Sequence, residues 1–170
     1  RYLAVTGVQT CALPISFGGA MGGFTTGRKE IIDLLRQRSR PYLFSNSVAP
    51  AVIGASIEVF NMLRESNALH DKLVENVNYF REKMTAAGFD IKPTQSAICA
   101  VMLYDAKLSQ IYAARMQEEG IYVTGFYYPV VPKDQARIRV QISAGHEREH
   151  LDKCIDAFIK VGKELGVLSR

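Results

Sequence analysis

The clearest structural pattern in this sequence is the run Ala136-Arg137-Ile138-Arg139-Val140-Gln141-Ile142-Ser143. Apolar and polar residues alternate here with a period of two, the period at which the side chains of a β-strand point to opposite faces. Every second residue from Ile138 is apolar, and the intervening ones, from Arg137, are polar. The run therefore predicts a strand with one face against a core.

Strand-like and helix-like segments alternate on both sides of this strand. Residues 98–103 and 121–126 read as apolar strands, and residues 106–119 between them read as a helix that Gly120 ends. After the strand, one face of a last helix carries the apolar residues Leu151, Ile155, Phe158 and Leu165. This alternation predicts an α/β chain.

The first half of the chain predicts three helices. Residues 29–38 form the first, which we expect Pro41 to end. A second begins near Ala49 with Pro50 in its first turn, and because its first charge is Glu58 we expect it to be buried. A third carries Leu69, Leu73, Val77, Phe80 and Met84 on one face and stops at Gly88. The break at Ser66 and Asn67 predicts a border between two lobes.

Composition excludes several classes of protein. The 170 residues are 48% hydrophobic and 22% charged, which suits a globular core, and no apolar run reaches the roughly 20 residues of a membrane helix. Three cysteines are too few for a disulfide framework, so we expect a reducing, cytoplasmic setting. With a net charge of +4 and one basic cluster at Arg36, Arg38 and Arg40, we expect no nucleic-acid partner.

The first sixteen residues do not resemble the rest. Residues 5–15 read Val-Thr-Gly-Val-Gln-Thr-Cys-Ala-Leu-Pro-Ile, which matches the translation of a common sequencing-library adapter. We therefore interpret residues 1–16 as a non-native tail and expect the natural reading frame to begin near Phe17. An unusual natural tail is the alternative.

Two places in the chain suit the binding of an anion. Ser45, Asn46 and Ser47 precede the helix at Ala49, where N–H groups and the helix dipole favour a phosphate. A helix cap is the alternative reading of these residues. Arg139 lies in mid-strand, where a guanidinium can bind a carboxylate through two parallel hydrogen bonds; by pattern alone, Arg137 serves equally well.

The segment His146-Glu147-Arg148-Glu149-His150 fits the H-E-x-x-H signature of zinc hydrolases. Two histidines four residues apart on a helix can hold zinc, with Glu147 as base. Three features oppose this reading: His146 lies at the very start of the expected helix, no histidine follows His150, and glutamates are common in a first helical turn. A zinc hydrolase is kept as a remote alternative, and we assign no metal ligand.

Two longer blocks carry a resemblance to a known family. Residues 36–47 read Arg-Gln-Arg-Ser-Arg-Pro-Tyr-Leu-Phe-Ser-Asn-Ser, with Ala-Pro at 49–50. Residues 120–126 read Gly-Ile-Tyr-Val-Thr-Gly-Phe, followed by Tyr-Pro-Val-Val-Pro-Lys at 128–133 and Gln-Ala-Arg-Ile-Arg at 135–139. From Phe17 onward the chain resembles the α-oxoamine synthases, and the Phe-Ser-Asn-Ser form favours the glycine C-acetyltransferases (2-amino-3-ketobutyrate CoA ligases) among them.

The resemblance implies a pyridoxal-phosphate (PLP) enzyme with the aspartate-aminotransferase fold, fold type I. It implies that residues 17–66 are the end of the large PLP-binding domain with a connecting helix, and that residues 67–170 are a C-terminal α+β small domain. It further implies a homodimer that condenses glycine with acetyl-CoA in threonine and glycine metabolism. A synthase of the 8-amino-7-oxononanoate or 5-aminolevulinate type is the alternative.

The resemblance also assigns residues. Ser45 and Asn46 match the residues that reach the PLP phosphate, in the family from the neighbouring subunit, and Arg139 matches the arginine that holds the substrate carboxylate. The family's Schiff-base lysine precedes a Gly-Gly-Ala-x-Gly-Gly run, found here at residues 18–23, and its position falls on Ile15. Because isoleucine has no amine, we expect this C-terminal fragment to be inactive. We also expect residues 17–60 to be less stable than the later lobe, since their sheet partners would lie upstream.

Overall fold

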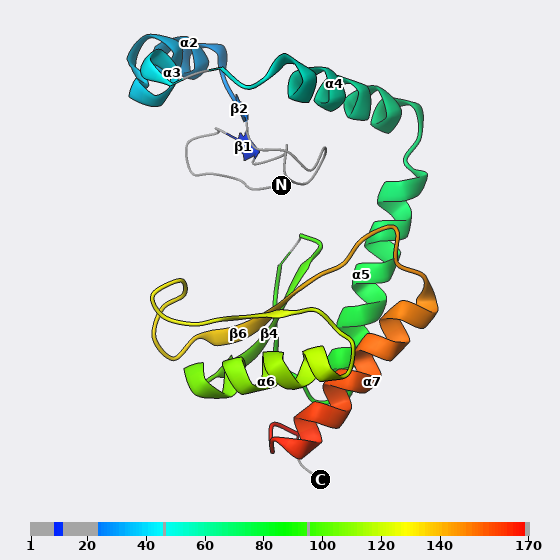
Figure 1. Ribbon diagram of the computed structural model, residues 1–170. Helices are drawn as coiled ribbons and strands as arrows, with labels where there is room; N and C mark the ends of the chain where they lie inside the picture. The colour runs from blue at the N-terminus through cyan, green and yellow to red at the C-terminus, as the bar shows by residue number, and fades with distance from the viewer. Residues whose placement is uncertain (1–8, 12–23, 46, 95, 169–170) are drawn as a thin grey trace. The chain divides into compact units, whose positions relative to one another are not determined.

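A computed structural model of the chain describes residues 9–11, 24–45, 47–94 and 96–168 (Figure 1). The chain divides into two units, Arg1–Asn67 and Ala68–Arg170. This division falls beside Ser66, where the sequence predicts a border. That the two units are a large and a small domain stays a prediction. That residues 1–16 are a non-native tail also stays a prediction.

The first unit consists of a short strand pair and three helices. Strands β1 (Gln9–Cys11) and β2 (Phe24–Thr26) pair antiparallel, with Thr10 opposite Thr25. Helices α2 (Lys29–Arg38), α3 (Arg40–Phe44) and α4 (Pro50–Glu65) follow. The bounds of α2 match the prediction. A helix over residues 40–44 was not predicted.

The prediction that Pro41 ends α2 is wrong in detail. The helix ends at Arg38, where the Ser39 amide donates to the Leu35 carbonyl at 2.8 Å, and Pro41 lies in the first turn of α3. A proline fits a first turn because its missing N–H would have no partner inside the helix there. Pro41 therefore starts a helix, and Ser39 separates the two.

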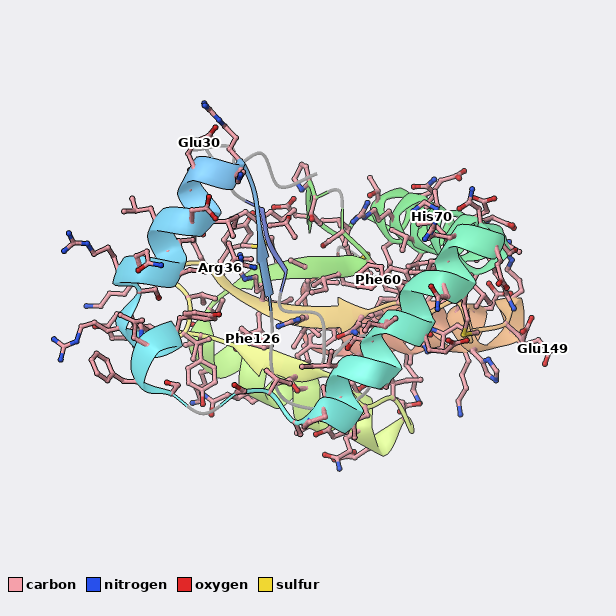
Figure 2. All side chains as sticks on the ribbon, turned by 90° about the horizontal axis from the view of Figure 1, so that it is seen from above. Glu30, Arg36, Phe60, His70, Phe126 and Glu149 are labelled. Atoms are coloured by element: carbon pink, nitrogen blue, oxygen red, sulfur yellow. The ribbon has the colours of Figure 1, made fainter. Side chains whose placement is uncertain are left out.

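The prediction that α4 is a buried helix is wrong for this chain. None of its residues is buried, and Ile53 and Ile57 are 47% and 57% exposed. Figure 2 shows the side chains that project from this helix, Phe60 among them. The low charge of a helix indicates that it packs against other elements. In the described part of this unit, however, β1 packs on β2 and α2 packs on α3, and little apolar surface packs on α4.

The second unit is an antiparallel sheet with three helices. Its elements are α5 (Ala68–Ala86), β3 (Ile91–Lys92), β4 (Ile98–Tyr104), α6 (Ala106–Glu118), β5 (Thr124–Phe126), β6 (Ala136–Gln141) and α7 (Arg148–Glu164). The strand order is β3-β4-β6-β5, and every pair is antiparallel. Helix α6 contacts β4, β5 and β6, and α7 contacts both α5 and α6 (Figure 1).

The alternating strand is the centre of this sheet. In β6, Ile138 and Val140 are buried, Arg137 is half-buried and Arg139 is exposed, which confirms the predicted alternation. Ile138 lies opposite Val101 of β4 and Gly125 of β5. One face of the strand therefore belongs to the core, and its arginine face does not.

The core lies between the sheet and the three helices. Phe158 of α7 is fully buried and meets the rings of Phe80, Phe89 and Tyr112, with ring centroids 6.3, 6.0 and 5.7 Å away. The Tyr112 hydroxyl donates to the Phe158 carbonyl at 2.6 Å, so the polar end of this buried ring has a partner. The apolar faces predicted for α5 and α7 supply two of these four rings, Phe80 and Phe158.

The ends of the helices follow the predicted glycines, and one predicted strand is shorter than expected. Gly88 and Gly120 have φ values of 98° and 79°, the left-handed conformation that ends helices. After Gly120, the Ile121 amide donates to the Met116 carbonyl at 2.9 Å, so Ile121 completes the end of α6 and the strand begins only at Thr124.

Among the residues that the structure describes, no helix is long and apolar enough to cross a membrane.

Candidate functional site

Arg139 is presented on the outer face of the sheet, and an aromatic ring holds its guanidinium. In the sheet it lies between Ala100 of β4 and Thr124 of β5. Its guanidinium carbon is 5.7 Å from the centre of the Phe126 ring, a cation–π contact. Within the described part of the chain its side chain makes no other polar contact, so its five N–H donors are available to a ligand.

Arg137 shares this face but differs in its surroundings. It is half-buried and lies directly opposite Met102 of β4 and Phe126 of β5. Phe126 reaches diagonally across the sheet to Arg139, as a long side chain can at two residues' offset. The structure therefore distinguishes two arginines that the strand pattern alone could not.

The position of Phe126 depends on the absence of a side chain at Gly125. A Cβ atom placed there would lie 2.7 Å from the Ser109 carbonyl oxygen of α6, closer than real Cβ contacts allow. Ser109 is fully buried, and its hydroxyl donates to the Ala106 carbonyl at 2.8 Å. Gly125 thus lets β5 pack closely against α6. The position of β5 in turn fixes where the Phe126 side chain contacts Arg139.

The predicted phosphate site is only partly described. Ser45 is an exposed residue at the end of α3, with its amide donating to the Pro41 carbonyl at 2.9 Å. Ala49, not a serine, is the N-cap of α4, and no described side chain makes a capping hydrogen bond there. Capping by Ser45 or Ser47 is therefore not what the structure shows. Asn46, and Ile15 at the predicted lysine position, lie outside the described residues.

The H-E-x-x-H segment performs a structural role. His146 precedes α7, Glu147 is its N-cap and His150 lies in its first turn. The Ser143 amide donates to His146 Nδ1 at 3.2 Å, and the Glu147 amide donates to His150 Nδ1 at 3.0 Å. Over the described ranges, the structure contains no group of three metal-ligating side chains. A third zinc ligand is thus not found near these two rings.

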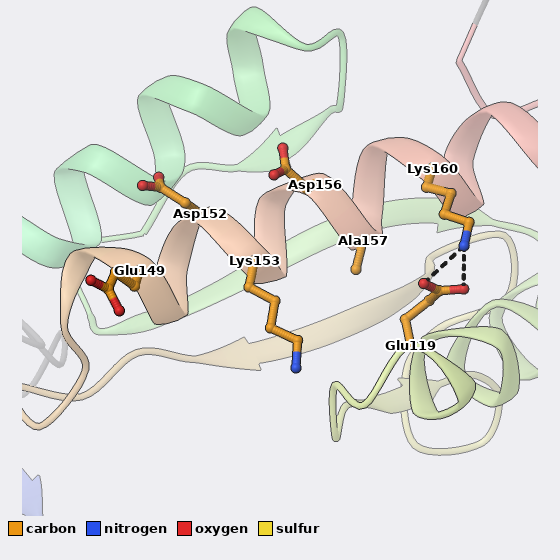
Figure 3. A pocket seen from close by; sticks show the side chains of 7 residues that line it. All are labelled: Glu119, Glu149, Asp152, Lys153, Asp156, Ala157 and Lys160. Carbon is orange, nitrogen blue, oxygen red and sulfur yellow. Dashed lines mark hydrogen bonds and ion pairs between the residues drawn. The ribbon is translucent and has the colours of Figure 1, made fainter.

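A groove of the second unit lies along α7. It is an open groove of about 520 Å³, lined by Glu119, Glu149, Asp152, Lys153, Asp156, Ala157 and Lys160 (Figure 3). The Lys160 ammonium lies 2.8 Å from one Glu119 carboxylate oxygen, and this hydrogen bond lowers the pKa of Glu119. Neither Ser45 nor Arg139 lines the groove. Its lining is mostly paired surface charge, which gives it no evident chemistry.

Cys99 and Cys154 are poor nucleophile candidates. Burial raises the pKa of the Cys154 thiol to about 12, and burial also raises the pKa of the fully buried Cys99, against the opposing effect of Arg81. Both are free thiols. Because the thiolate is the reactive form, neither is prepared for covalent catalysis.

Sequence reasoning missed Phe126 and Gly125 as parts of the arginine's environment. Both lie in the block at residues 120–126 that carries the family resemblance, so the signal was present without an assigned role. Ser45 belongs to the first unit and Arg139 to the second. The residues that the structure brings together are Arg139 and Phe126.

Comparison with known proteins supplies the context for these residues. The sequence profile described as Aminotransferase class I and II matches residues 9–158. The 2-amino-3-ketobutyrate coenzyme A ligase of Salmonella typhimurium is 54% identical over 162 residues, which are 95% of this chain and 41% of that protein. The 8-amino-7-oxononanoate synthase of Thermosipho melanesiensis is 47% identical over 150 residues, 88% of this chain and 38% of that protein.

The fold has a counterpart among solved structures. Serine palmitoyltransferase from S. paucimobilis, with a bound PLP-myriocin aldimine, matches with a TM-score of 0.80 and 26% identity over 88% of this chain and 38% of that one. The chain spans about two fifths of the length of the curated relatives that it matches. These matches confirm the predicted fold class and the resemblance to 2-amino-3-ketobutyrate CoA ligases. The chain belongs to the class I and II aminotransferase family.

Proposed function

We propose that this chain is part of a glycine C-acetyltransferase that uses PLP. The observation that carries the proposal is its 54% identity, over 95% of its length, to the 2-amino-3-ketobutyrate coenzyme A ligase of Salmonella typhimurium. In the reaction, a bond forms between the α-carbon of glycine and the acetyl carbonyl carbon, and the thioester C–S bond breaks. The α-carbon loses a proton, the CoA sulfur ends as a thiol, and the product is 2-amino-3-oxobutanoate.

Arg139 fits the role of the carboxylate-binding group. Its exposed guanidinium can donate two parallel N–H groups to the glycine carboxylate, and the Phe126 ring 5.7 Å away restricts where it points. In an intact enzyme that carries these residues, we expect Arg139→Lys to raise the KM for glycine by about tenfold or more, because lysine cannot form the paired contact. Arg137→Lys is the matched control and should change KM much less. Equal effects of the two substitutions would overturn the assignment.

Ser45 and Asn46 are proposed to bind the cofactor phosphate. The exposed Ser45 hydroxyl precedes the N-terminus of α4, a 16-residue helix, and such an end favours anions. Bound at this site, PLP supplies a conjugated ring that stabilises negative charge at the glycine α-carbon. The resemblance assigns these residues to the site of the neighbouring subunit, so we also propose that the whole enzyme is a homodimer. Light scattering of the intact protein tests its mass in solution.

The 170-residue chain itself is proposed to be inactive. A lysine amine is needed to hold the cofactor and to move a proton at the α-carbon, and the family resemblance places that lysine's position at Ile15. Purified chain mixed with PLP should give no absorbance of lysine-bound PLP, and no CoA should be released from acetyl-CoA and glycine. The Salmonella relative serves as the positive control. Both signals from this chain would overturn the proposal.

A second candidate is an 8-amino-7-oxononanoate synthase, favoured by the 47% identity to the Thermosipho protein. The two activities differ in the amino acid and the acyl-CoA that they accept. Release of CoA by the intact parent with glycine and acetyl-CoA supports the first function. Release only with another amino acid and a longer acyl-CoA supports the second.

We place the parent enzyme in the cytoplasm. The two described cysteines outside the first unit, Cys99 and Cys154, are both free thiols, as suits a reducing compartment. Cell fractionation followed by immunodetection tests the placement. Recovery with an oxidising or membrane-bounded compartment would contradict it.

A further inference from the structure

The connection between β6 and α7 is closed by two imidazole rings that act as hydrogen-bond acceptors. His146 Nδ1 accepts from the Ser143 amide at 3.2 Å, and His150 Nδ1 accepts from the Glu147 amide at 3.0 Å. The two ring centroids are 6.5 Å apart. In each case the backbone amide carries the hydrogen, so the ring nitrogen must offer a lone pair. Both rings are therefore neutral when these bonds exist.

The same connection is joined to α5 by a buried side chain. Asn76 is 4% exposed, and its amide nitrogen donates to the Ser143 carbonyl at 3.1 Å and to the His146 carbonyl at 2.8 Å. Asn76 and the two rings thus all form hydrogen bonds with the backbone of residues 143–147. A change in the protonation of the rings therefore acts on a backbone segment that Asn76 already joins to α5.

Two ion pairs surround this segment. Lys72 lies 2.6 Å from Glu147, and Arg148 lies 2.6 Å from Glu75, so each joins α5 to the start of α7. The Arg148 guanidinium also lies 3.8 Å from the centre of the Tyr79 ring. These four charged side chains are in this way already paired with each other.

We propose that His146 and His150, with the Ser143 and Glu147 amides, form a proton-sensitive histidine clasp. The clasp fixes the β6–α7 connection when both rings are neutral and releases it when they take up a second proton. A protonated ring has no lone pair at Nδ1 and presents an N–H to a backbone N–H. It also places a positive charge at the N-terminus of α7, where the helix dipole disfavours cations.

Of the charged groups that face the clasp, only the carboxylates oppose this effect, and they do so weakly. The charged groups are Lys72 and Glu75 on α5, and Glu147, Arg148, Glu149 and Asp152 around the start of α7. Glu147 would attract a charged His150, but its carboxylate already binds Lys72. Asp152 accepts from the Tyr79 hydroxyl at 2.5 Å. Exposed attractions of this kind contribute little, so the loss of two acceptors decides the sign. Stability should therefore fall as the pH is lowered.

The chain allows a sharp test because it has only three histidines. His150→Gln and His146→Asn keep an acceptor oxygen in reach of each amide but cannot be protonated; Gln is favoured at this third helical position. His70 on α5, labelled in Figure 2 and 65% exposed, is the control, because its ring nitrogen faces Asp71 and accepts from none of the described backbone amides. Urea unfolding of the full chain is measured by circular dichroism at about pH 8 and about pH 5, the range in which imidazoles titrate.

We expect the wild-type unfolding equilibrium constant to rise on acidification by about fivefold per ring more than that of the double variant. His70→Gln should behave as the wild type. In the wild-type chain, the amide NMR signals of Ser143 and Glu147 should shift together with the ring signals of His146 and His150. This second measurement needs no variant to fold. An equal response of the wild type and the double variant, or amide signals that ignore the titration of the rings, would overturn the proposal.

Discussion

Helices α4 and α5 follow each other in the chain but differ in burial. Helix α4 is rich in apolar residues over Pro50–Glu65, yet none of them is buried. Helix α5 carries more charges over Ala68–Ala86, yet it buries Val77, Phe80 and Met84 together with Asn76. The apolar content of a helix shows that it needs a cover. Only the rest of the fold shows whether the cover is present.

The same contrast holds for the two units as a whole. The second unit packs a sheet and three helices around one core, from Val77 to Leu168. In the first unit, α2, α3 and α4 contain no buried residue. Since burial of apolar surface is the main favourable contribution to folding, the second unit should hold nearly all of the chain's stability.

Limited proteolysis should show the largest difference. We expect cleavage within residues 47–67 to be about a hundredfold faster than within residues 68–168, because a protease cuts a segment in proportion to its opening. Mass spectrometry of the resistant product should place its start near Ala68. Equal resistance of residues 17–60 and of the later lobe would contradict the contrast between the units.

A matched pair of phenylalanines gives the next largest effect. Phe80 is fully buried and Phe44 is 80% exposed. Phe80→Ala should lower the free energy of unfolding by about 3–5 kcal/mol through the lost burial and the cavity. Phe44→Ala should change it by less than about 0.5 kcal/mol. Urea denaturation followed by circular dichroism measures both, and a comparable loss for Phe44→Ala would show that the first unit has a core of its own.

Two glycines should respond to the same substitution with opposite signs. Gly125→Ala places a methyl group 2.7 Å from the Ser109 carbonyl oxygen and should cost about 1–3 kcal/mol in unfolding free energy. Gly54 lies within α4 with no atom within 4 Å of its added Cβ. Gly54→Ala should stabilise that helix by about 0.5–1 kcal/mol, seen as higher helical content. A loss of helix in Gly54→Ala would mean that α4 is packed after all.

The helix caps should give a smaller effect than the loss of the buried Phe80 ring. Asp105 caps α6, accepting from the Leu108 amide at 2.6 Å, and Asp105→Ala should cost about 1 kcal/mol in thermal or urea unfolding. At the corresponding position of α4, Ala49 makes no side-chain cap within the described residues, so Ala49→Asp should raise the helicity of α4. The comparison fails if Asp105→Ala is neutral.

Much of the second unit could be predicted from periodicity. The alternation around Ile138 and the apolar face of α7 at Leu151, Ile155 and Phe158 correspond to buried positions in the structure. The site was harder to predict. Choosing Arg139 over Arg137 required the family resemblance, and the physical difference between them is the Phe126 ring, which comes from another strand.

The sequence by itself determined where the longer helices and strands of the second unit form, which face of β6 is apolar, and to which family the chain belongs. These depend on local spacing and on residue identity, which are present in the linear chain. Only the tertiary structure decided that none of the residues of α4 is buried, that Phe126 meets Arg139, and that His146 and His150 accept hydrogen bonds from backbone amides. Each of these depends on what approaches a side chain in space, and local spacing alone does not specify that.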